Sequence, residues 1–396
     1  MDIERIKKAP VALAGCDGYD REKVYETVKR LLTSIGASEQ TFKGKRVVLK
    51  PNLVAAKDPS AAVTTHPSVV DAVTRCAREF GAADVMIAES PGGSYTEPFL
   101  SRIYDATGMK ELSENGGPRL NGDFTSVPVK FAEGKKLKSF EVLTPVANAD
   151  VIVNIPKLKT HSLTGLSCAV KNLFGVIPGF LKFEMHAAYP ELDDFSEMLC
   201  DLDLALYRDH EIVTVCDAVF SMEGNGPTHG SPVFTGVLMA STSTYALDVV
   251  AERLAGLGGT ARYLDIAARK GLVERDPDKI EVVRTGDVPE SFKLVLPDSK
   301  KPNSFSMRLL IALPNLFGGK FSRFFEPSPK INVEKCLGCS NCANVCPAKT
   351  ITMKKKKGKK LAVIGRKNCI RCFCCQELCP HGAVDTVKNP ILKLIR

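Results

Sequence analysis

The motif Cys336-Leu-Gly-Cys339-Ser-Asn-Cys342-Ala-Asn-Val-Cys346-Pro347 is repeated 33 residues later as Cys369-Ile-Arg-Cys372-Phe-Cys-Cys375-Gln-Glu-Leu-Cys379-Pro380. Each copy places three cysteines at intervals of three residues and a fourth cysteine four residues further on, directly before a proline. Because the spacing is repeated without a gap, both copies are expected to build the same kind of site. The repeat marks residues 330–396 as a small domain of their own.

The spacing is typical of cysteines that bind 4Fe-4S clusters. Three thiolates at intervals of three residues can hold one cluster from a single tight loop, whereas the fourth cysteine lies too far along to reach the same cluster. We therefore expect each fourth cysteine to ligate the other cluster. The expected ligands are Cys336, Cys339, Cys342 and Cys379 for the first cluster, and Cys369, Cys372, Cys375 and Cys346 for the second.

Structural zinc is the alternative metal, because Cys-x-x-Cys pairs also form zinc sites. Zinc needs only two such pairs per ion, so it explains neither the third cysteine at the same interval nor the prolines.

Cys374 breaks the symmetry of the repeat. It could replace Cys375 as a ligand, but only Cys375 keeps the spacing of the first copy, and we interpret Cys374 as a neighbouring free thiol that fills space.

The composition is that of an ordinary water-exposed protein, with 44% hydrophobic and 25% charged residues in 396. No run of 18 uncharged apolar residues occurs, and Met1–Pro10 has no apolar stretch of signal-peptide type. The expected compartment is the cytoplasm.

Five cysteines lie outside the repeat, and they are expected to be reduced and mostly buried thiols. They are Cys16, Cys76, Cys168, Cys200 and Cys216.

The positive charge is concentrated at the C-terminus. Of a net charge of +9, residues 331–396 contribute 14 Lys and Arg against 3 Asp and Glu. Six of these lysines, Lys354–Lys357, Lys359 and Lys360, lie between two β-type segments, 350–353 and 361–364. They predict either a solvated hairpin tip or a docking patch for an acidic redox partner or anionic lipid. No aromatic residues are interleaved with the lysines, which argues against nucleic acid as the partner.

Residues 1–300 alternate short apolar segments with amphipathic helical ones, a pattern that predicts an α/β domain with a mostly parallel sheet covered by helices on both faces. The C-terminal domain is expected to be a small α+β unit. Residues 301–329 form an apolar and basic linker between them. The linker either packs the C-terminal domain against the α/β domain or lies on a membrane surface as a peripheral contact.

Polar residues gather where the predicted parallel strands end, and such ends meet along one edge of a sheet. We expect one ligand cleft there. Lysines could bind a carboxylate or phosphate group, and carboxylates with a histidine could transfer protons or hold a metal. The catalytic candidates are Lys157, His161, Lys171, Glu89 and Asp217. The candidates for binding the ligand are Lys50, Asn52, His66, Lys159, Asn172, Glu223 and Asn225. Neither a dinucleotide nor a P-loop fingerprint occurs.

Five segments of the α/β part resemble the DUF362 family, a domain of unknown function. They are Lys50-Pro51-Asn52, Thr65-His66-Pro67, Asn154–His161, Lys171–Gly175 and Glu223–Pro227. The resemblance covers about residues 10–255 and supplies no catalytic residues. The C-terminal part resembles the bacterial two-cluster ferredoxin module, and family members often carry such a tail, which implies a redox role.

Together these features predict an iron-sulfur oxidoreductase that relays electrons through two 4Fe-4S clusters to an anionic ligand in the α/β cleft. Two other functions fit the sequence. The protein could be a ferredoxin-like electron carrier whose large domain only binds partners, or a scaffold or sensor with structural clusters. Cluster potentials range so widely with their surroundings that sequence does not choose between relay and sensor.

Overall fold

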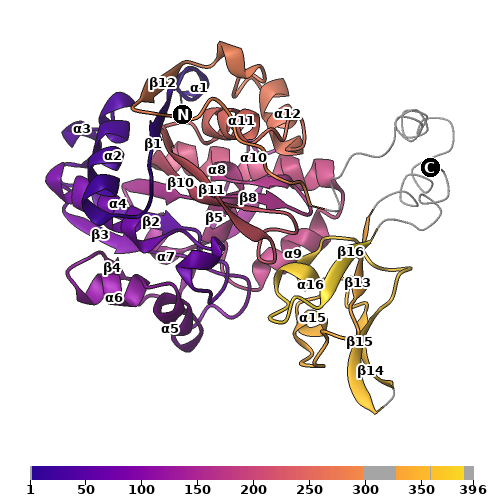
Figure 1. Ribbon diagram of the computed structural model, residues 1–396. Helices are drawn as coiled ribbons and strands as arrows, with labels where there is room; N and C mark the ends of the chain where they lie inside the picture. The colour runs from indigo at the N-terminus through magenta and orange to yellow at the C-terminus, as the bar shows by residue number, and fades with distance from the viewer. Residues whose placement is uncertain (1, 298–326, 357, 388–396) are drawn as a thin grey trace.

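The computed structural model describes residues 2–297, 327–356 and 358–387. Figure 1 shows a large α/β part and a smaller C-terminal module beside it. Most of the predicted linker lies outside the described residues, so its packing or membrane role stays a prediction. The first strand of the module, β13, spans Ser328–Ile331, and the bounds of the domains stay a prediction. Within the described residues, no helix is both long and apolar enough to cross a membrane.

The α/β part is built on one ten-stranded sheet. Its main strand order is β12 (Val282–Thr285), β1 (Val11–Gly15), β11 (Ser231–Ser241), β10 (Glu211–Glu223), β7 (Val151–Ile155), β2 (Arg46–Pro51), β3 (Asp84–Ile87) and β4 (Arg119–Leu120). β8 (Lys157–His161) pairs with β10 and with β9 (Gly165–Ser167). Apart from β11 and β9, which pair antiparallel with their neighbours, the sheet is parallel, as predicted.

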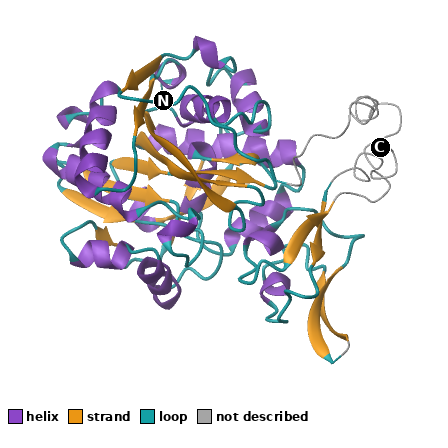
Figure 2. Ribbon diagram, in the orientation of Figure 1, coloured by secondary structure: helices purple, strands orange, loops and turns teal. Residues whose placement is uncertain are grey.

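Helices pack on both faces of this sheet (Figure 2), because successive side chains of its central strands point to opposite faces. In β7, Val151, Val153 and Ile155 enter one apolar core, and Ile152 enters the other. The first core is covered by α2 (Arg21–Ser34), α4 (Pro67–Glu79), α5 (Glu97–Ala106) and α6 (Met109–Glu114). The second is covered by α8 (Ala169–Leu173), α10 (Leu192–Asp209), α11 (Thr244–Leu254) and α12 (Arg262–Arg269).

Shorter elements complete the α/β part. The helices are α1 (Ile3–Lys7), α3 (Glu39–Phe42), α7 (Thr144–Ala147) and α9 (Leu181–Ala188), with 3-10 turns at Pro59–Ala61, Phe174–Val176 and Pro277–Lys279. β5 (Ser126–Lys130) and β6 (Ser139–Leu143) form a separate antiparallel pair. Helices α5 and α6 are separated at Gly108, whose φ of 74° is left-handed.

Two differences bear on the predicted cleft. β10 does not end at Asp217 but continues past a bulge to Glu223, so Asp217 lies inside a strand. Lys157–His161, read from the sequence as part of a strand exit, forms the fully buried strand β8. The polar residues of β8 do not alternate with apolar ones, so the sequence gives no sign of a strand there. The strand can be buried because its polar side chains have polar partners inside the protein.

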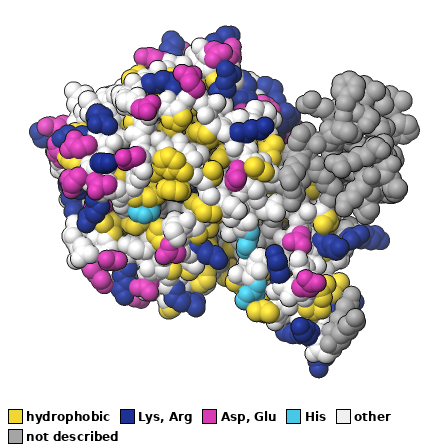
Figure 3. Space-filling model, in the orientation of Figure 1, with side chains coloured by type: hydrophobic (Ala, Val, Ile, Leu, Met, Phe, Trp, Pro, Cys, Tyr) yellow, Lys and Arg dark blue, Asp and Glu magenta, His cyan; other side chains and the backbone are white. Residues whose placement is uncertain are grey.

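The C-terminal module contains two antiparallel strand pairs. β13 pairs with β16 (Val384–Val387), and β14 (Ile351–Lys356) pairs with β15 (Lys359–Ile364). Each cysteine motif contributes one short helix, α15 (Asn341–Asn344) or α16 (Cys374–Glu377). The β14–β15 hairpin carries the exposed side chains of Lys354, Lys355, Lys359 and Lys360. Figure 3 shows Lys and Arg side chains on the surface of this module.

Candidate functional site

A pocket of about 60 Å³ lies where the α/β part meets the C-terminal module. By the measure of roughly 10–15 Å³ per water, it has room for a few waters or a small ion. Seven predicted site residues line it: Lys50, Asn52, Glu89, Lys159, His161, Lys171 and Asn172. The sequence did not point to Lys182 and His186 of α9, nor to Cys374, Glu377 and Leu378 of the module.

Buried amides hold one side of the pocket in place. Asn172 donates from Nδ2 to Asn154 Oδ1 (2.8 Å) and to the Lys50 carbonyl oxygen (3.0 Å), and its Oδ1 accepts from Asn52 Nδ2 (2.9 Å). Asn52 Oδ1 in turn accepts from Lys159 Nζ (2.8 Å). The side-chain amides of Asn52 and Asn172 are hydrogen-bonded within this network. The network therefore holds the Lys159 ammonium group in place, although no carboxylate pairs with that group.

The first turn of α8 is fixed by a buried carboxylate. Asp248 accepts from the backbone N–H groups of Ala169 (2.7 Å) and Val170 (3.1 Å), and Tyr263 Oη donates to it (2.8 Å). These bonds satisfy N–H groups that have no partner within a helix. They also orient the helix that presents Lys171 and Asn172 to the pocket.

Lys50 and Glu89 form a buried ion pair at the ends of β2 and β3. Lys50 Nζ also donates to the Pro51 carbonyl oxygen (3.0 Å). Gly175 lies against this pair: a Cβ there would be 2.5 Å from Glu89 Oε1 and 2.7 Å from Lys50 Nζ. Only glycine leaves room for the two charges to meet at this point of the chain.

Lys171 and Lys182 differ from Lys50 in having no carboxylate partner. Lys182 Nζ donates to Ser90 Oγ (3.2 Å) and to the backbone carbonyl groups of Pro91 and Ile177. Lys171 Nζ lies over the rings of Phe174 (4.6 Å to the centroid) and Phe195 (5.8 Å). Within the described residues, the Lys171 ammonium has neither a carboxylate nor a hydrogen-bond partner.

Leaving aside its two histidines, the charged side chains that line the pocket are four lysines and two glutamates, Glu89 and Glu377. Burial lowers the pKa of Lys50 and of Lys171, and it lowers the pKa of Lys159 and that of Lys182 to about 7 each. Glu377 of the module acts in the opposite direction on the pKa of Lys159, of Lys171 and of Lys182, because its negative charge favours the ammonium forms. The pocket therefore favours a negatively charged occupant.

The two histidines of the pocket are held by neighbouring groups. His186 stacks on Phe195, with 4.4 Å between ring centroids, and burial lowers its pKa to about 3, so its ring is neutral. His161 Nδ1 accepts from the backbone N–H of Leu163 (3.0 Å). This bond anchors the His161 ring at the turn after β8, where it borders the pocket.

The C-terminal module forms one wall of the pocket through α16, which lies beside α9 in Figure 1. Phe183 packs against Cys374 and Val345, and Thr228 Oγ1 donates to the Glu377 carbonyl oxygen (2.7 Å). Gly92 faces Leu378, and a Cβ there would be 3.1 Å from the leucine side chain. The module therefore sits close against the loop that follows β3.

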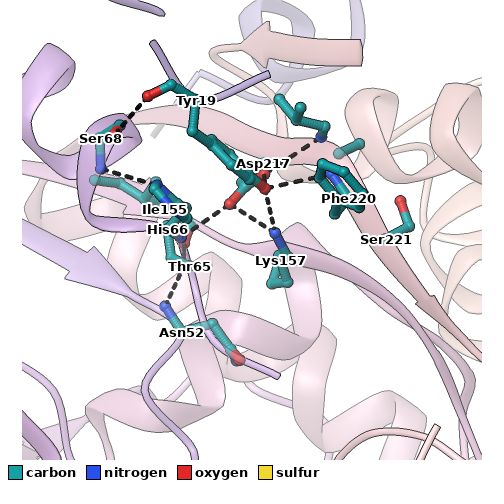
Figure 4. A network of polar contacts seen from close by, with 12 residues as sticks. Tyr19, Asn52, Thr65, His66, Ser68, Ile155, Lys157, Asp217, Phe220 and Ser221 are labelled. Carbon is teal, nitrogen blue, oxygen red and sulfur yellow. Dashed lines mark hydrogen bonds and ion pairs between the residues drawn. The ribbon is translucent and has the colours of Figure 1, made fainter. Parts of the chain in front are cut away.

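Three predicted site residues, Lys157, His66 and Asp217, lie together elsewhere, in the network of Figure 4. Lys157 Nζ donates to Asp217 Oδ2 (2.9 Å) and to Tyr19 Oη (2.7 Å), and Tyr19 Oη donates to Asp217 Oδ1 (2.8 Å). The Asp217 carboxylate also accepts from the backbone N–H of His66 (2.9 Å). Tyr19 stacks on His66 at 3.6 Å, and burial lowers the His66 pKa to about 4.

The expected single cleft is thus divided. In this network the Asp217 carboxylate pairs with Lys157 and accepts from the backbone N–H of His66. None of these three residues lines the pocket, and the pocket is not lined by Glu223 or Asn225 either. Glu223 Oε2 instead accepts from the Val295 N–H (2.7 Å). The described residues contain no group of three or more His, Cys, Asp or Glu side chains arranged to hold a metal ion.

The two sets of cysteines expected from the repeat lie close to each other in the module. Cys342 interacts electrostatically with Cys379, Cys336 and Cys339. Cys375 interacts with Cys372, Cys369 and Cys346, as well as with Cys342. Cys342, Cys375 and Cys379 are buried in one small core of the module. Cysteine thiolates are the donors that iron-sulfur clusters take, so the residues present fit such clusters, and which four cysteines hold each cluster stays a prediction.

Comparisons with known proteins agree with these two parts. Residues 335–383 match the 4Fe-4S dicluster domain. The chain is 29% identical, over 327 residues, to the thylakoid-associated protein sll1697 of Synechocystis, covering 80% of this chain and 94% of that protein. It is 34% identical over 73 residues to an uncharacterized polyferredoxin-like protein of Methanocaldococcus jannaschii, covering 16% of this chain and 44% of that protein.

Among solved structures, the lactate racemase apoprotein of Thermoanaerobacterium thermosaccharolyticum is 15% identical with a TM-score of 0.38, and the match covers 65% of this chain and 60% of that one. The model of the domain of unknown function DUF362 matches residues 47–253, just over half of the chain. This range contains the amide network and all four lysines of the pocket. The chain therefore belongs to the DUF362 family, and it carries an iron-sulfur domain of the 4Fe-4S dicluster type at its C-terminal end.

Proposed function

We propose that this protein is an iron-sulfur oxidoreductase that acts on a small anion in the pocket between its two parts. The observation that carries the proposal is the pocket itself, because four lysines of the α/β part face the helix of the second cysteine motif across it. The module holds two 4Fe-4S clusters on the two cysteine sets, and when bound they supply single electrons. The substrate would then lie next to the electron source.

The charge and size of the pocket support an anionic substrate. Lys171 offers an ammonium without a carboxylate partner, and Lys159 and Lys182 bond only to neutral groups within the described residues. A volume of about 60 Å³ accommodates an oxyanion or a short carboxylate, but not a nucleotide. We place the anion against Lys171, with Lys159 and Lys182 as further cationic contacts.

The same lysines are suited to proton transfer, which the reduction of an anion commonly requires. With a pKa of about 7, the Nζ atoms of Lys159 and Lys182 hold a proton that can be given up near neutral pH. His186 is neutral and buried against Phe195, so it is a packing group rather than an acid. Lys157 and Asp217 lie outside the pocket and serve to hold β8 and β10 together.

The test uses the full chain, purified anaerobically, with iron and sulfide quantified and EPR spectra recorded after reduction. Reduced protein is mixed with a panel of small oxyanions and short carboxylates, and its re-oxidation is followed by absorbance. We expect about eight irons per chain and re-oxidation by at least one anion, which a Lys171→Met variant slows. Re-oxidation at equal rates by wild type and variant for every active anion would overturn the proposal.

A simple electron carrier is the second candidate, and the exposed lysines of the β14–β15 hairpin favour it. A redox partner with an acidic surface would dock there, because clustered lysines steer such encounters. This candidate predicts reversible reduction of the protein by the partner without turnover of any small molecule. The relative's name places that protein at thylakoids, so sedimentation with anionic vesicles is the control that separates a protein partner from a lipid surface.

A further inference from the structure

The helix α16 belongs to the pocket and to the cysteine set at the same time. Cys375 is an expected cluster ligand, whereas Cys374 and Glu377, one residue before it and two after it, line the pocket. An occupant of the pocket and the second cluster are therefore separated by a single short helix. Salt screens buried or partly buried charges much less than exposed ones, so two charges this close to each other should interact.

We propose that the pocket binds its anion more weakly when the cluster held by Cys369, Cys372 and Cys375 is reduced, and that Lys171 and Lys159 carry this coupling. The inference rests on the proposed function, since it concerns the same pocket. One-electron reduction adds one negative charge behind α16. The two ammonium groups interact with that charge and with the anion, so the two negative charges compete for the same positive ones.

Glu377 is a charged residue of α16 that lines the same pocket as these lysines. Its negative charge is the strongest electrostatic influence on Lys159 and on Lys171, opposing the effect of their burial. A further negative charge on the cysteine loop acts through the same two lysines. Because coupling between two binding equilibria is reciprocal, a bound anion must lower the reduction potential of the cluster by the same free energy.

This coupling gives the reaction an order. The oxidised protein binds the anion more tightly, and the bound anion makes the cluster, once reduced, a stronger electron donor toward its neighbour. The external one-electron donor delivers its electron to the module and is itself oxidised by one electron. A cluster held there would pass this electron to the anion, which would be reduced by one electron, and the protein would return to the oxidised state with the higher affinity for a new anion.

The experiment measures sulfate binding to the full chain by anaerobic calorimetry in two states, as isolated and after reduction with reduced methyl viologen, a cationic one-electron donor that does not compete for the pocket. We expect the dissociation constant for sulfate to rise at least threefold on reduction. In EPR-monitored titrations, sulfate should lower the potential of one cluster in proportion, by 59 mV per tenfold change in affinity.

Two variants locate the effect. Glu377→Gln removes one negative charge from the pocket wall, so sulfate should bind several-fold more tightly in both redox states, whereas Glu97→Gln, exposed at the start of α5, should change neither value. With Lys171→Met, sulfate should no longer shift the potential. A shift that persists in this variant would place the anion elsewhere and overturn the inference.

The two proposals fail in different ways. Equal sulfate affinity in the oxidised and reduced states would refute the coupling and leave the anion site intact. Absence of sulfate binding in both states would refute the coupling and the anion pocket together.

Discussion

Replacing Lys171 with methionine removes a charge from the pocket while keeping an unbranched side chain against Phe174 and Phe195. The ammonium has no carboxylate partner among the described residues, and burial lowers its pKa, so the fold disfavours the charged form. The cation–π contacts are lost, at about 0.5–2 kcal/mol, but so is the cost of burying the charge. We expect the variant to fold and to melt at a temperature no lower than that of the wild type.

The effect on anion binding should be much larger. A hydrogen bond between charged groups contributes about 1.5–3 kcal/mol, and at about 1.4 kcal/mol per factor of ten this is roughly a 10- to 140-fold loss of affinity. Lys159 and Lys182 already share their protons with neutral oxygen atoms, so they cannot replace the missing contact in full. Loss of binding without loss of stability is the signature of a side chain kept for function.

The assay is calorimetric titration of the oxidised protein with sulfate at pH 6, alongside a thermal melt of each sample. Lys110→Met serves as the control, because Lys110 is exposed on α6, away from the pocket. It should leave both the affinity and the melting temperature unchanged. Wild-type affinity in Lys171→Met would refute the proposed anchor, and a clear drop in its melting temperature would refute the argument that the charge opposes folding.

Three further predictions follow from the same structure. Sulfate affinity should fall as the pH rises from 6 to 8, because Lys159 and Lys182 lose protons near their pKa of about 7; titrations of wild-type protein that give one affinity across this range would contradict those protonation states. Gly175→Ala should destabilise the protein by about 3–5 kcal/mol, since its Cβ would separate a buried ion pair, and a wild-type melting curve would show that the pair can move apart. Neutralising Lys354 and Lys355 with glutamine should remove the salt dependence of reduction by an acidic donor protein, and unchanged stopped-flow rates would argue against docking at the hairpin.

Much of this architecture follows from the sequence alone. The alternation of apolar and helical segments predicted the mostly parallel sheet, and Lys50, Asn52 and Glu89 could be assigned to one edge because they follow neighbouring strands. Lys157 and Asp217 were expected in the same cleft, but they pair with each other across adjacent strands. That pairing depends on how β8 aligns with β10, and strand register between segments 60 residues apart leaves no local pattern in the sequence.

The parts of the pocket that sequence reasoning missed have a different origin. Lys182 lies between two apolar residues, Leu181 and Phe183, and a lysine in such surroundings is a signal of a buried charge that needs partners. Glu377 and Leu378 reach the pocket only because the module docks against Gly92 and Thr228. Docking between two parts of a chain depends on their complementary surfaces, which neither spacing nor periodicity records.

The contact between Gly92 and Leu378 has a consequence for how such proteins can diverge. The space that the missing Cβ of Gly92 leaves is filled by a leucine from the other part of the chain. A larger residue at position 92 would require a smaller one at position 378, so the two positions are expected to vary together among family members with this tail. In members without the tail, position 92 is released from this constraint, and a different element must close that side of the pocket.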